Sequence, residues 1–390
     1  MEEMSKALRK HYEWKGKIAI KSLVAIDNQQ DLAVAYTPGV ADACLAIRDD
    51  VAKSFELTRR WNTVAVITDG TAVLGLGDIG PEAGMPVMEG KCLLFKEFAD
   101  IDAFPLCIKS KNTEDIIRTV QLLSGSFGGI NLEDISAPRC FEIERQLREI
   151  CPIPVMHDDQ HGTAIVVCAA LKNALKLVKK SIQKVRIVIN GPGAAGLAIG
   201  KLLISYGAEN IIFVDKKGIL DTNDPYINSE QQSMAVITNP DRRQGTLQDA
   251  LVDCDVFIGV SAGKVLNAEM VHSMNRQPII FAMANPIPEI FPNDALAAGA
   301  YIVGTGRSDY PNQINNVLAF PGIFRGALDC RAKTINEAMK MAAVDALADL
   351  IDEQELSVTN IIPSLFDQRV VKAVSTAVIK AAIETKVSQL

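Results

Sequence analysis

Residues 185–203 read VRIVINGPGAAGLAIGKLL, an apolar strand followed by a glycine turn and a helical pattern. The turn holds Gly191, Gly193 and Gly196 in the G-x-G-x-x-G spacing of dinucleotide sites. The first glycine allows the tight turn, the second lets the backbone approach a pyrophosphate, and the third lets the helix pack on the strand. The helix N-terminus supplies N–H donors. This segment therefore predicts a dinucleotide site in a doubly wound parallel sheet.

The acid expected at the end of the next strand is Asp215, which closes the apolar run at residues 210–214. An acid in this place usually accepts the ribose 2′-hydroxyl of NAD. Lys216 and Lys217 follow directly, and either can instead bind the 2′-phosphate of NADP. The residues favour NAD and leave NADP open.

A second glycine run, LGLGDIG at residues 74–80, has the same spacing after the apolar run at residues 63–68. Pro81, Gly84 and Pro86 follow it and predict that no helix begins there. Without a helix dipole the run lacks the donors that bind a phosphate, so we interpret it as a structural turn.

The pattern of the chain changes once along its 390 residues. Short apolar runs, such as residues 92–95 and 103–108, mix with glycine and proline clusters until about residue 151. A long helical pattern then starts at residue 162, and strands alternate with helices after it, as in a parallel sheet. We expect an α/β protein with an N-terminal α/β domain at residues 1–155 and a Rossmann-type domain with C-terminal helices at residues 156–390.

Composition excludes several classes of protein. A net charge of −7 disfavours a nucleic-acid surface, which needs a basic stripe. Eight cysteines without C-x-x-C spacing are typical of free thiols in a reducing compartment. The first residues, MEEMSKALRKHYEWKGKIAI, have no apolar signal region, and no run of about 18 uncharged apolar residues occurs. We expect a cytoplasmic protein that binds neither nucleic acid nor membrane.

Two acidic pairs lie in the first half of the chain. Glu133 and Asp134 follow the glycines of GGINLEDIS, and Asp158 and Asp159 precede the long helical pattern. Carboxylates from two loops can share a hard cation such as Mg²⁺ or Mn²⁺. Acidic pairs at loop ends are more often solvated, and Asp159 can also cap its helix, so both interpretations stay open.

Lys91 is a candidate general base because the apolar run after it can desolvate the amine and lower its pKa. Tyr36, at a turn before a predicted helix, is a candidate acid. A solvated lysine and a packed tyrosine are the ordinary alternatives. His157 and His161 have the separation of two zinc ligands, but aspartates lie between them, and we favour simple hydrogen bonding.

Seven blocks of the chain, in order, resemble the malic enzymes, specifically the short bacterial form, and the resemblance covers nearly the whole sequence. The blocks are YTPGVA (36–41), TDGTAVLGLGDIGPEAGMPVMEGKCLLFKEFADIDAFP (68–105), GGINLEDISAPRCFEIE (128–144), HDDQHGTAIV (157–166), NGPGAAG (190–196), ANPIPE (284–289) and NNVLAFPGIFRGAL (315–328). The resemblance implies an N-terminal domain for substrate and metal. It also implies oxidative decarboxylation of L-malate to pyruvate and CO₂ with NAD or NADP and Mg²⁺ or Mn²⁺, in a homodimer or larger homo-oligomer.

The resemblance also implies a role for each matching residue. Lys91 would deprotonate the C2 hydroxyl, Tyr36 would protonate enolpyruvate, and Asp158 would position Lys91 or a metal ligand. The implied metal ligands are Glu133, Asp134 and Asp159. The cofactor contacts are Gly191, Gly193, Ala194, Ala195, Gly196, Asp215, Lys216 and Thr163. The implied substrate contacts are Lys91, Asn285, Asn315 and its neighbour Asn316.

One departure concerns the substrate. Long-form malic enzymes place a substrate-binding arginine shortly before LGLGD, where this chain has Thr71, Ala72 and Val73. How the malate carboxylate is neutralised is therefore open.

Three other functions are alternatives to the malic enzyme reaction. The same site can run a malolactic reaction that retains NAD and releases lactate. A nucleotide sensor would need none of the candidate catalytic residues. A metal-free hydroxyacid dehydrogenase would need a histidine base, and none of the four histidines has that context.

Overall fold

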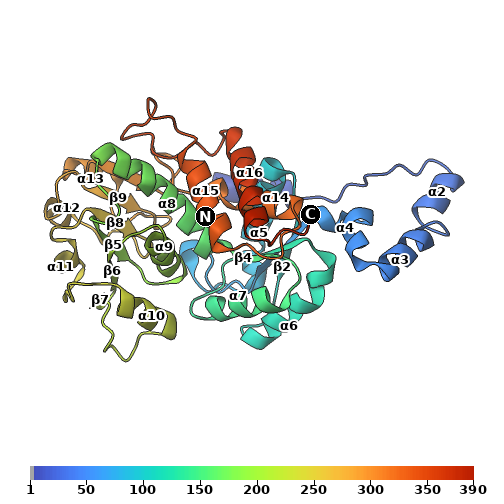
Figure 1. Ribbon diagram of the computed structural model, residues 1–390, viewed down its shortest axis with the longest axis horizontal. Helices are drawn as coiled ribbons and strands as arrows, with labels where there is room; N and C mark the ends of the chain where they lie inside the picture. The colour runs from blue at the N-terminus through green and yellow to red at the C-terminus, as the bar shows by residue number, and fades with distance from the viewer. Residues whose placement is uncertain (1–3) are drawn as a thin grey trace.

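The computed structural model describes residues 4–390, and its core is built on two sheets (Figure 1). The first is parallel, with the order β2-β1-β3-β4. Its strands are β1 (Thr63–Thr68), β2 (Asp102–Cys107), β3 (Gly129–Leu132) and β4 (Val155–His157). The expected strand at residues 63–68 is confirmed to the residue.

The second sheet has the order β10-β9-β8-β5-β6-β7 and is parallel except for β7. Its strands are β5 (Arg186–Asn190), β6 (Asn210–Asp215), β7 (Gly218–Ile219), β8 (Val256–Gly259), β9 (Ile279–Ala282) and β10 (Ile302–Thr305). The chain leaves β5 for β6 on one side and later fills the other side with β8. The glycine turn that follows β5 therefore lies at the point where the strand order reverses, as in a Rossmann-type sheet. The expected α/β fold is confirmed.

Helix α5 (Pro81–Ala99) corrects one prediction. The helix begins directly after the LGLGDIG turn, although Pro81 and Pro86 were expected to prevent it. Pro81 is the first helical residue, whose N–H has no partner within a helix, and Pro86 costs a single backbone hydrogen bond near the start. The apolar run at residues 92–95 is part of this helix. The other helices of this region are α6 (Thr113–Leu123) and α7 (Arg139–Ile150).

Helix α8 (Asp158–Val178) carries the chain from the first sheet to the second. It begins four residues before the expected start at residue 162, and its first turn includes Asp158 and Asp159. His157 is its N-cap residue, so Asp159 does not cap the helix. Within the part of the chain that the structure describes, α8 is the helix long and apolar enough to cross a membrane. However, 72% of that apolar window is buried inside the protein, as in a core helix.

The C-terminal helices α14 (Phe320–Asp329), α15 (Glu337–Ala348) and α16 (Arg369–Glu384) pack on one another, with α15 against α8 and α14 against α5. The ring of Phe95 on α5 lies 4.7 Å from that of Phe320 and 5.3 Å from that of Phe324. One hydrophobic core therefore includes side chains from both sheets. The domain boundary expected between residues 155 and 156 falls within β4 and stays a prediction.

The second sheet also carries α9 (Ala194–Ser205), which packs on α8. Smaller helices surround it: α10 (Ser229–Ile237), α11 (Leu247–Leu251), α12 (Ala268–His272) and α13 (Pro292–Ala297). Short 3-10 helices lie at Val51–Lys53, Arg59–Asn62, Leu74–Leu76, Ser124–Ser126 and Asn316–Leu318.

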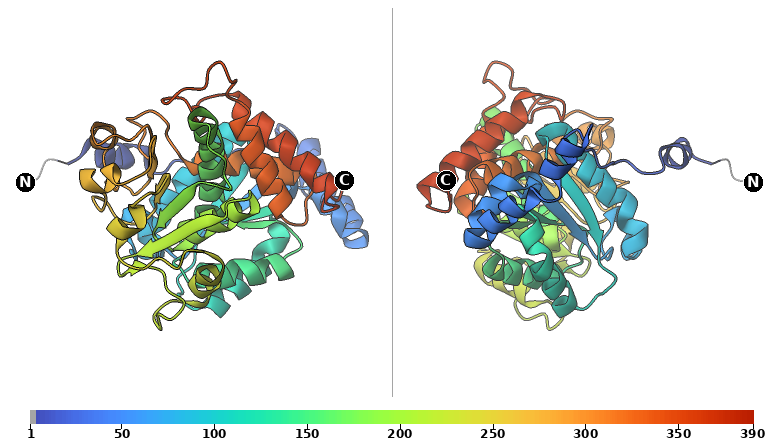
Figure 2. Two further views of the ribbon diagram at one scale, coloured as in Figure 1. Left: turned by 60° about the vertical axis from the view of Figure 1, so that its left-hand side comes forward. Right: turned by 90° about the vertical axis from the view of Figure 1, so that its right-hand side faces the viewer.

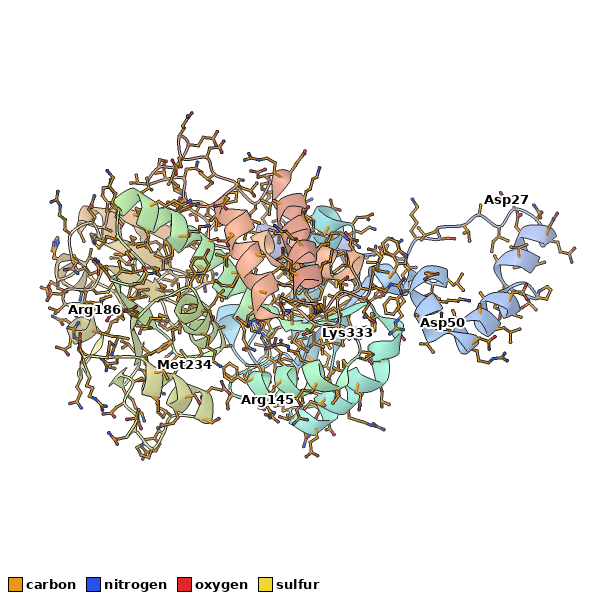
Figure 3. The ribbon with its side chains drawn as sticks, viewed as in Figure 1. Asp27, Asp50, Arg145, Arg186, Met234 and Lys333 are labelled. Carbon is orange, nitrogen blue, oxygen red and sulfur yellow. The ribbon has the colours of Figure 1, made fainter. Side chains whose placement is uncertain are left out.

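The N-terminal helices α1 (Lys6–Trp14), α2 (Gln29–Ala35) and α3 (Val40–Asp49) contain no buried residue. Residues 18–50 form an arm, holding α2 and α3, that extends away from the two sheets and returns at α4 (Ser54–Leu57) (Figures 1 and 3). Helix α1 stands away from the body in another direction (Figure 2). The exposed apolar side chains of the arm are Ile18, Ile20, Leu23, Val24, Ile26, Leu32, Val34, Tyr36, Val40 and Leu45.

Candidate active site

A cavity of about 1090 Å³ lies where the carboxyl ends of both sheets converge. Residues that directly follow strands of the first sheet line it, and so do residues that follow β5, β8, β9 and β10 of the second. Ligands bind at such carboxyl ends in open α/β sheets because the loops there are free to carry polar groups. This cavity is therefore the candidate active site.

The candidate metal ligands meet in this cavity. One ligand atom from each of Glu133, Asp134 and Asp159 lies within 4.8 Å of the others. Glu133 and Asp134 follow β3, and Asp159 lies in the first turn after the neighbouring strand β4, so strand pairing brings the two acidic loops together. The backbone N–H of Asp134 donates to Asp159 Oδ2 at 2.8 Å. Three carboxylates at this spacing fit a hard cation such as Mg²⁺ or Mn²⁺.

The amine of Lys91, on α5, is buried between two carboxylates. Its Nζ lies 2.7 Å from Asp158 Oδ2 and 2.9 Å from Glu133 Oε1. Burial by itself lowers the pKa of Lys91, but the negative charges of Asp158 and Glu133 outweigh it and raise the pKa above its usual value. The expectation that an apolar environment would lower this pKa is wrong, because that expectation ignored the paired acids.

Asp158 is fully buried beneath Lys91. Burial raises its pKa to about 7, while Lys91 lowers it and the charge of Glu133 raises it further. The side chain has room because residue 162 is glycine: a Cβ there would lie 1.8 Å from Asp158 Oδ1. Burial likewise raises the pKa of Asp159 to about 6, and Lys91 opposes that rise. Glu133, Asp158 and Asp159 thus surround a single ammonium group, and this excess of negative charge favours the binding of a further cation.

Two of the three glycines of the dinucleotide turn have a steric reason to be glycine. Gly191 has a φ of +112°, and a Cβ there would lie 2.8 Å from the carbonyl oxygen of Val260. A Cβ on Gly196 would lie 2.0 Å from the carbonyl oxygen of Gly191, so the helix could not approach the turn. Gly193 faces open space and lines the cavity.

Helix α9 starts at Ala194 without a side-chain cap, so its first N–H groups remain available to an anion. Ala194 and Ala195 line the cavity, and Thr163 joins them from the first turns of α8. This is the arrangement that a pyrophosphate needs.

Asp215 and Lys216 lie at the end of β6, outside the residues that line the cavity. Asp215 Oδ1 accepts the backbone N–H of Lys217 at 2.7 Å. The Lys217 amine lies 3.9 Å from the centre of the Tyr226 ring. An acid and two lysines thus remain side by side at the strand end, and this geometry suits either a ribose hydroxyl or a phosphate.

The candidate substrate amides Asn285, Asn315 and Asn316 all line the cavity. The LGLGDIG turn packs against the first of them, since a Cβ on Gly75 would lie 2.3 Å from the Asn285 carbonyl oxygen. Asn315 also caps the short 3-10 helix that follows it, by accepting the N–H of Val317 at 3.0 Å.

Tyr36 is the candidate proton donor, and this chain does not bring it to the cavity. Its side chain is 67% exposed, and it lies on the arm directly after α2. It is not among the residues that line the cavity. Within one chain, Tyr36 therefore lies away from Lys91.

Neither histidine belongs to a zinc site. The ring of His161 forms the expected hydrogen bonds, whereas the buried ring nitrogens of His157 have no hydrogen-bond partner among the described residues. His161 Nε2 lies 2.8 Å from Glu144, and its Nδ1 lies 2.9 Å from the amine of Lys340. Glu144 also accepts the backbone N–H of His157 at 3.0 Å, which anchors the start of α8 to α7. Glu144 was not predicted as a functional residue, because the sequence around it has the pattern of an ordinary helix. Among the described residues, the one cluster with metal-ligand spacing is that of the three acids.

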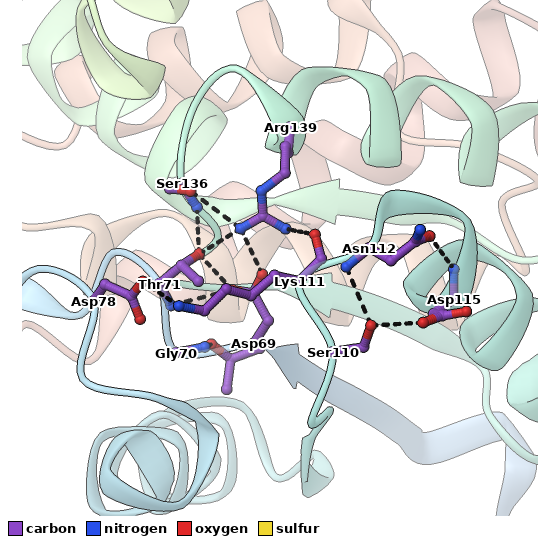
Figure 4. Close-up of polar contacts among 11 residues, drawn as sticks. Asp69, Gly70, Thr71, Asp78, Ser110, Lys111, Asn112, Asp115, Ser136 and Arg139 are labelled. Atoms are coloured by element: carbon purple, nitrogen blue, oxygen red, sulfur yellow. Dashed lines mark hydrogen bonds and ion pairs between the residues drawn. The ribbon is translucent and has the colours of Figure 1, made fainter.

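Arg139 was also not predicted from the sequence, where no local signal marks it. Figure 4 shows its polar contacts. Its Nη2 donates to Asp69 Oδ2 at 2.8 Å, to Thr71 Oγ1 at 2.9 Å and to Ser136 Oγ at 3.1 Å. Its Nη1 donates to the Lys111 carbonyl oxygen at 2.9 Å. The guanidinium therefore connects the loop after β1 to the loop that carries the acids. Both of its terminal nitrogens already donate hydrogen bonds to these loops and to the Lys111 carbonyl oxygen.

Comparison with known proteins identifies the family of the chain. Residues 15–117 match the family model described as "Malic enzyme, N-terminal domain", and residues 160–383 match "Malic enzyme, NAD binding domain". The chain is 56% identical over 385 residues to the "Bifunctional malic/malolactic enzyme" of Bacillus subtilis, covering 98% of this chain and 94% of that protein. It is also 56% identical over 374 residues to the "NAD-dependent malic enzyme" of Geobacillus stearothermophilus, covering 96% and 78%.

A solved structure agrees. The crystal structure of the NAD-dependent malic enzyme of Thermotoga maritima has a TM-score of 0.93 and 52% identity to this chain, and the match covers 96% of this chain and 99% of that one. Both family models and these near full-length relatives point to one family. The chain, with its NAD-binding domain and its N-terminal α/β domain, belongs to the malic enzyme family.

Proposed function

We propose that this protein converts L-malate to pyruvate and CO₂ with reduction of NAD or NADP, and that it needs Mg²⁺ or Mn²⁺. The observation that carries the proposal is the contact of the Lys91 amine with Asp158 and Glu133, on the same cavity as the glycine turn. Binding a dinucleotide requires neither a buried lysine nor three clustered acids. Their presence beside the cofactor turn supports chemistry on a small acid.

Glu133, Asp134 and Asp159 would hold the divalent cation, because their oxygens are hard donors within 4.8 Å of one another. A bound divalent cation supplies Lewis acidity, which polarises the substrate oxygen at C2 and stabilises the negative charge left when CO₂ departs. Asn131 orients the set by donating from Nδ2 to Glu133 Oε2 at 2.8 Å. Asn131 lies two residues before Glu133, so the alternation of the strand puts both side chains on one face.

Lys91 acts on the proton of the C2 hydroxyl. The hydrogen bond from Lys91 Nζ to Asp158 Oδ2 gives the amine a partner that can take a proton from it before it accepts the one from the substrate. A dinucleotide held at the glycine turn by Gly193 and the first N–H groups of α9 would supply the acceptor for the C2 hydride. Asn285, Asn315 and Asn316 would orient the substrate through their amides.

Tyr36 would protonate the enol at C3, and a second copy of the chain would have to supply it. The arm that carries Tyr36 exposes a row of apolar side chains and packs on neither sheet in this chain. Apolar surface of this extent in a globular protein marks an interface. We therefore propose a homodimer in which each arm reaches the cavity of the partner.

The test follows reduced cofactor with L-malate and Mn²⁺, with NAD and NADP assayed separately, and measures pyruvate and CO₂ at the end. Equal amounts of reduced cofactor, pyruvate and CO₂, lost on addition of a chelator, are the expected result. Dinucleotide binding without any turnover would instead indicate a nucleotide sensor.

A malolactic reaction is the second candidate, because the Bacillus subtilis relative is named a bifunctional malic and malolactic enzyme. In that reaction the cofactor stays bound and returns its hydride to pyruvate. Lactate and CO₂ formed without free reduced cofactor would show it. Both products can also arise in one preparation, so lactate is measured beside pyruvate.

A further inference from the structure

The candidate active site has few positive charges for a substrate with two carboxylates. Among the lining side chains that the structure describes, the cationic ones are Lys17 and Lys91. Lys91 is already paired with two acids. Ala72, which lines the same cavity, stands in the stretch where long-form malic enzymes have their substrate arginine. One carboxylate of the substrate can face the bound cation, and the other still needs a partner.

Lys17 is held at the cavity by helix α5, the helix that carries Lys91. Its Nζ donates to the carbonyl oxygen of Pro86 at 2.8 Å, and its backbone N–H donates to Glu89 Oε2 at 3.2 Å. The amine thus donates to a neutral carbonyl. The Glu89 carboxylate accepts from the backbone N–H of Lys17 and not from its amine. Two of its three donors remain for a ligand. Lys17 is half-buried, so a carboxylate that binds it loses part of its hydration.

We propose that Lys17 binds the carboxylate of malate that lies farther from the metal ligands, and so takes the place of the missing arginine. The inference rests on the proposed malate activity. Lys17 is a specificity residue: it recognises a substrate with a second carboxylate and takes no proton during the reaction.

The chemistry predicts which kinetic constant depends on Lys17. The distant carboxylate leaves as CO₂, so its negative charge fades in the transition state of decarboxylation. An ion pair with Lys17 is therefore at least as strong with bound malate as with the transition state, and its loss raises KM while kcat is preserved. A hydrogen bond between charged groups corresponds to a change of about 10- to 100-fold in KM.

The experiment compares Lys17→Met and Lys17→Arg with the control Lys15→Met. Lys15 is an exposed lysine two residues away that lies outside the arm and does not line the cavity. We measure kcat and KM for malate, KM for the dinucleotide, and inhibition by oxalate. Oxalate can chelate the metal but has no distant carboxylate.

The expected result is a raised KM for malate in Lys17→Met, with kcat and the oxalate inhibition constant unchanged and partial recovery in Lys17→Arg. A KM for malate equal to that of Lys15→Met would overturn the proposal. Parallel losses for malate, oxalate and dinucleotide, or a lowered melting temperature that explains them, would assign Lys17 to anchoring α5 and also overturn it. Absence of malate turnover in the unaltered protein would count against the proposed function itself.

Discussion

Lys91 Nζ lies 2.7 Å from Asp158 Oδ2, although 67 residues separate the two in the chain. The contact joins α5 of the first half to the first turn of α8, directly after β4. Asp159, the next residue, turns instead toward the backbone N–H of Asp134. Two adjacent aspartates therefore have different partners: one faces the candidate base, and the other belongs to the candidate metal site.

Replacing Lys91 by Ala should lower kcat for malate by about 10²- to 10⁴-fold, the usual contribution of a positioned proton-transfer group. Binding of dinucleotide and Mn²⁺ should persist, because neither contacts the amine in the proposed site. Lys96→Ala on the same helix is the control, since Lys96 pairs with Asp100 and Asp102 at the surface. Turnover near the parent rate would remove Lys91 from the chemistry.

Replacing Asp159 by Asn should weaken Mn²⁺ binding at least about tenfold, since it removes one charge from a cluster of three acids. The measurement is a titration of free Mn²⁺ by electron paramagnetic resonance. Dinucleotide affinity should not change. Asp78→Asn is the matched control, because Asp78 is an exposed partner of Lys111. Equal Mn²⁺ affinity in the two variants would contradict the assigned site.

Mixing two inactive variants tests which chain of the dimer supplies Tyr36 to each site. Tyr36→Phe and Lys91→Ala should each be inactive alone, but a heterodimer keeps one complete site if Tyr36 comes from the partner. Random reassociation should restore up to about a quarter of the parent activity, since half of the dimers are mixed and each has one intact site. Activity that stays at the level of the separate variants after exchange would show that Tyr36 serves its own chain or none.

The choice of dinucleotide is tested at the end of β6. Asp215→Ala should weaken NAD more than NADP, by about tenfold in the ratio of the two KM values, because a hydrogen bond from ribose to a charged acceptor is lost. Lys216→Ala is the opposite control and should weaken NADP more than NAD. An unchanged preference in Asp215→Ala would remove the acid from the ribose contact.

Glu144 should stabilise the fold in a pH-dependent way. Burial raises its pKa, but the charges of His161 and Lys340 outweigh that effect and lower the pKa to about 2 from a usual 4.5. The folded pKa is below the unfolded one, so the stabilisation is complete above about pH 4.5 and is lost as the pH falls toward 2.

Glu144→Gln should therefore reduce the free energy of unfolding by up to about 3 kcal/mol at pH 7. Urea unfolding of the variant and the parent at pH 7, 5 and 4 measures this difference, which should shrink at the lowest pH. Glu149→Gln, an exposed change on the same helix, is the control. A pH-independent difference would mean that packing, rather than the charge of Glu144, accounts for the loss.

Local patterns predicted much of this protein. The apolar run at residues 63–68 coincides with strand β1, and the helix expected after the glycine turn begins at Ala194. The glycine turn was also predicted, because its steric demands act over six residues. Helix α5 was missed, since its two prolines argue against a helix locally while its buried face, including Phe95, packs into the core.

The sequence by itself determined the dinucleotide turn, the residue types of the site and the family, because each depends on neighbours along the chain. Only the tertiary structure decided which groups meet. Strand order brings Glu133 and Asp159 together, packing of α5 on the first sheet puts Lys91 against Asp158, and the projecting arm takes Tyr36 away. The raised pKa of Lys91 follows from those meetings, since the charges that cause it lie 42 to 67 residues away in the chain but within 3 Å in space.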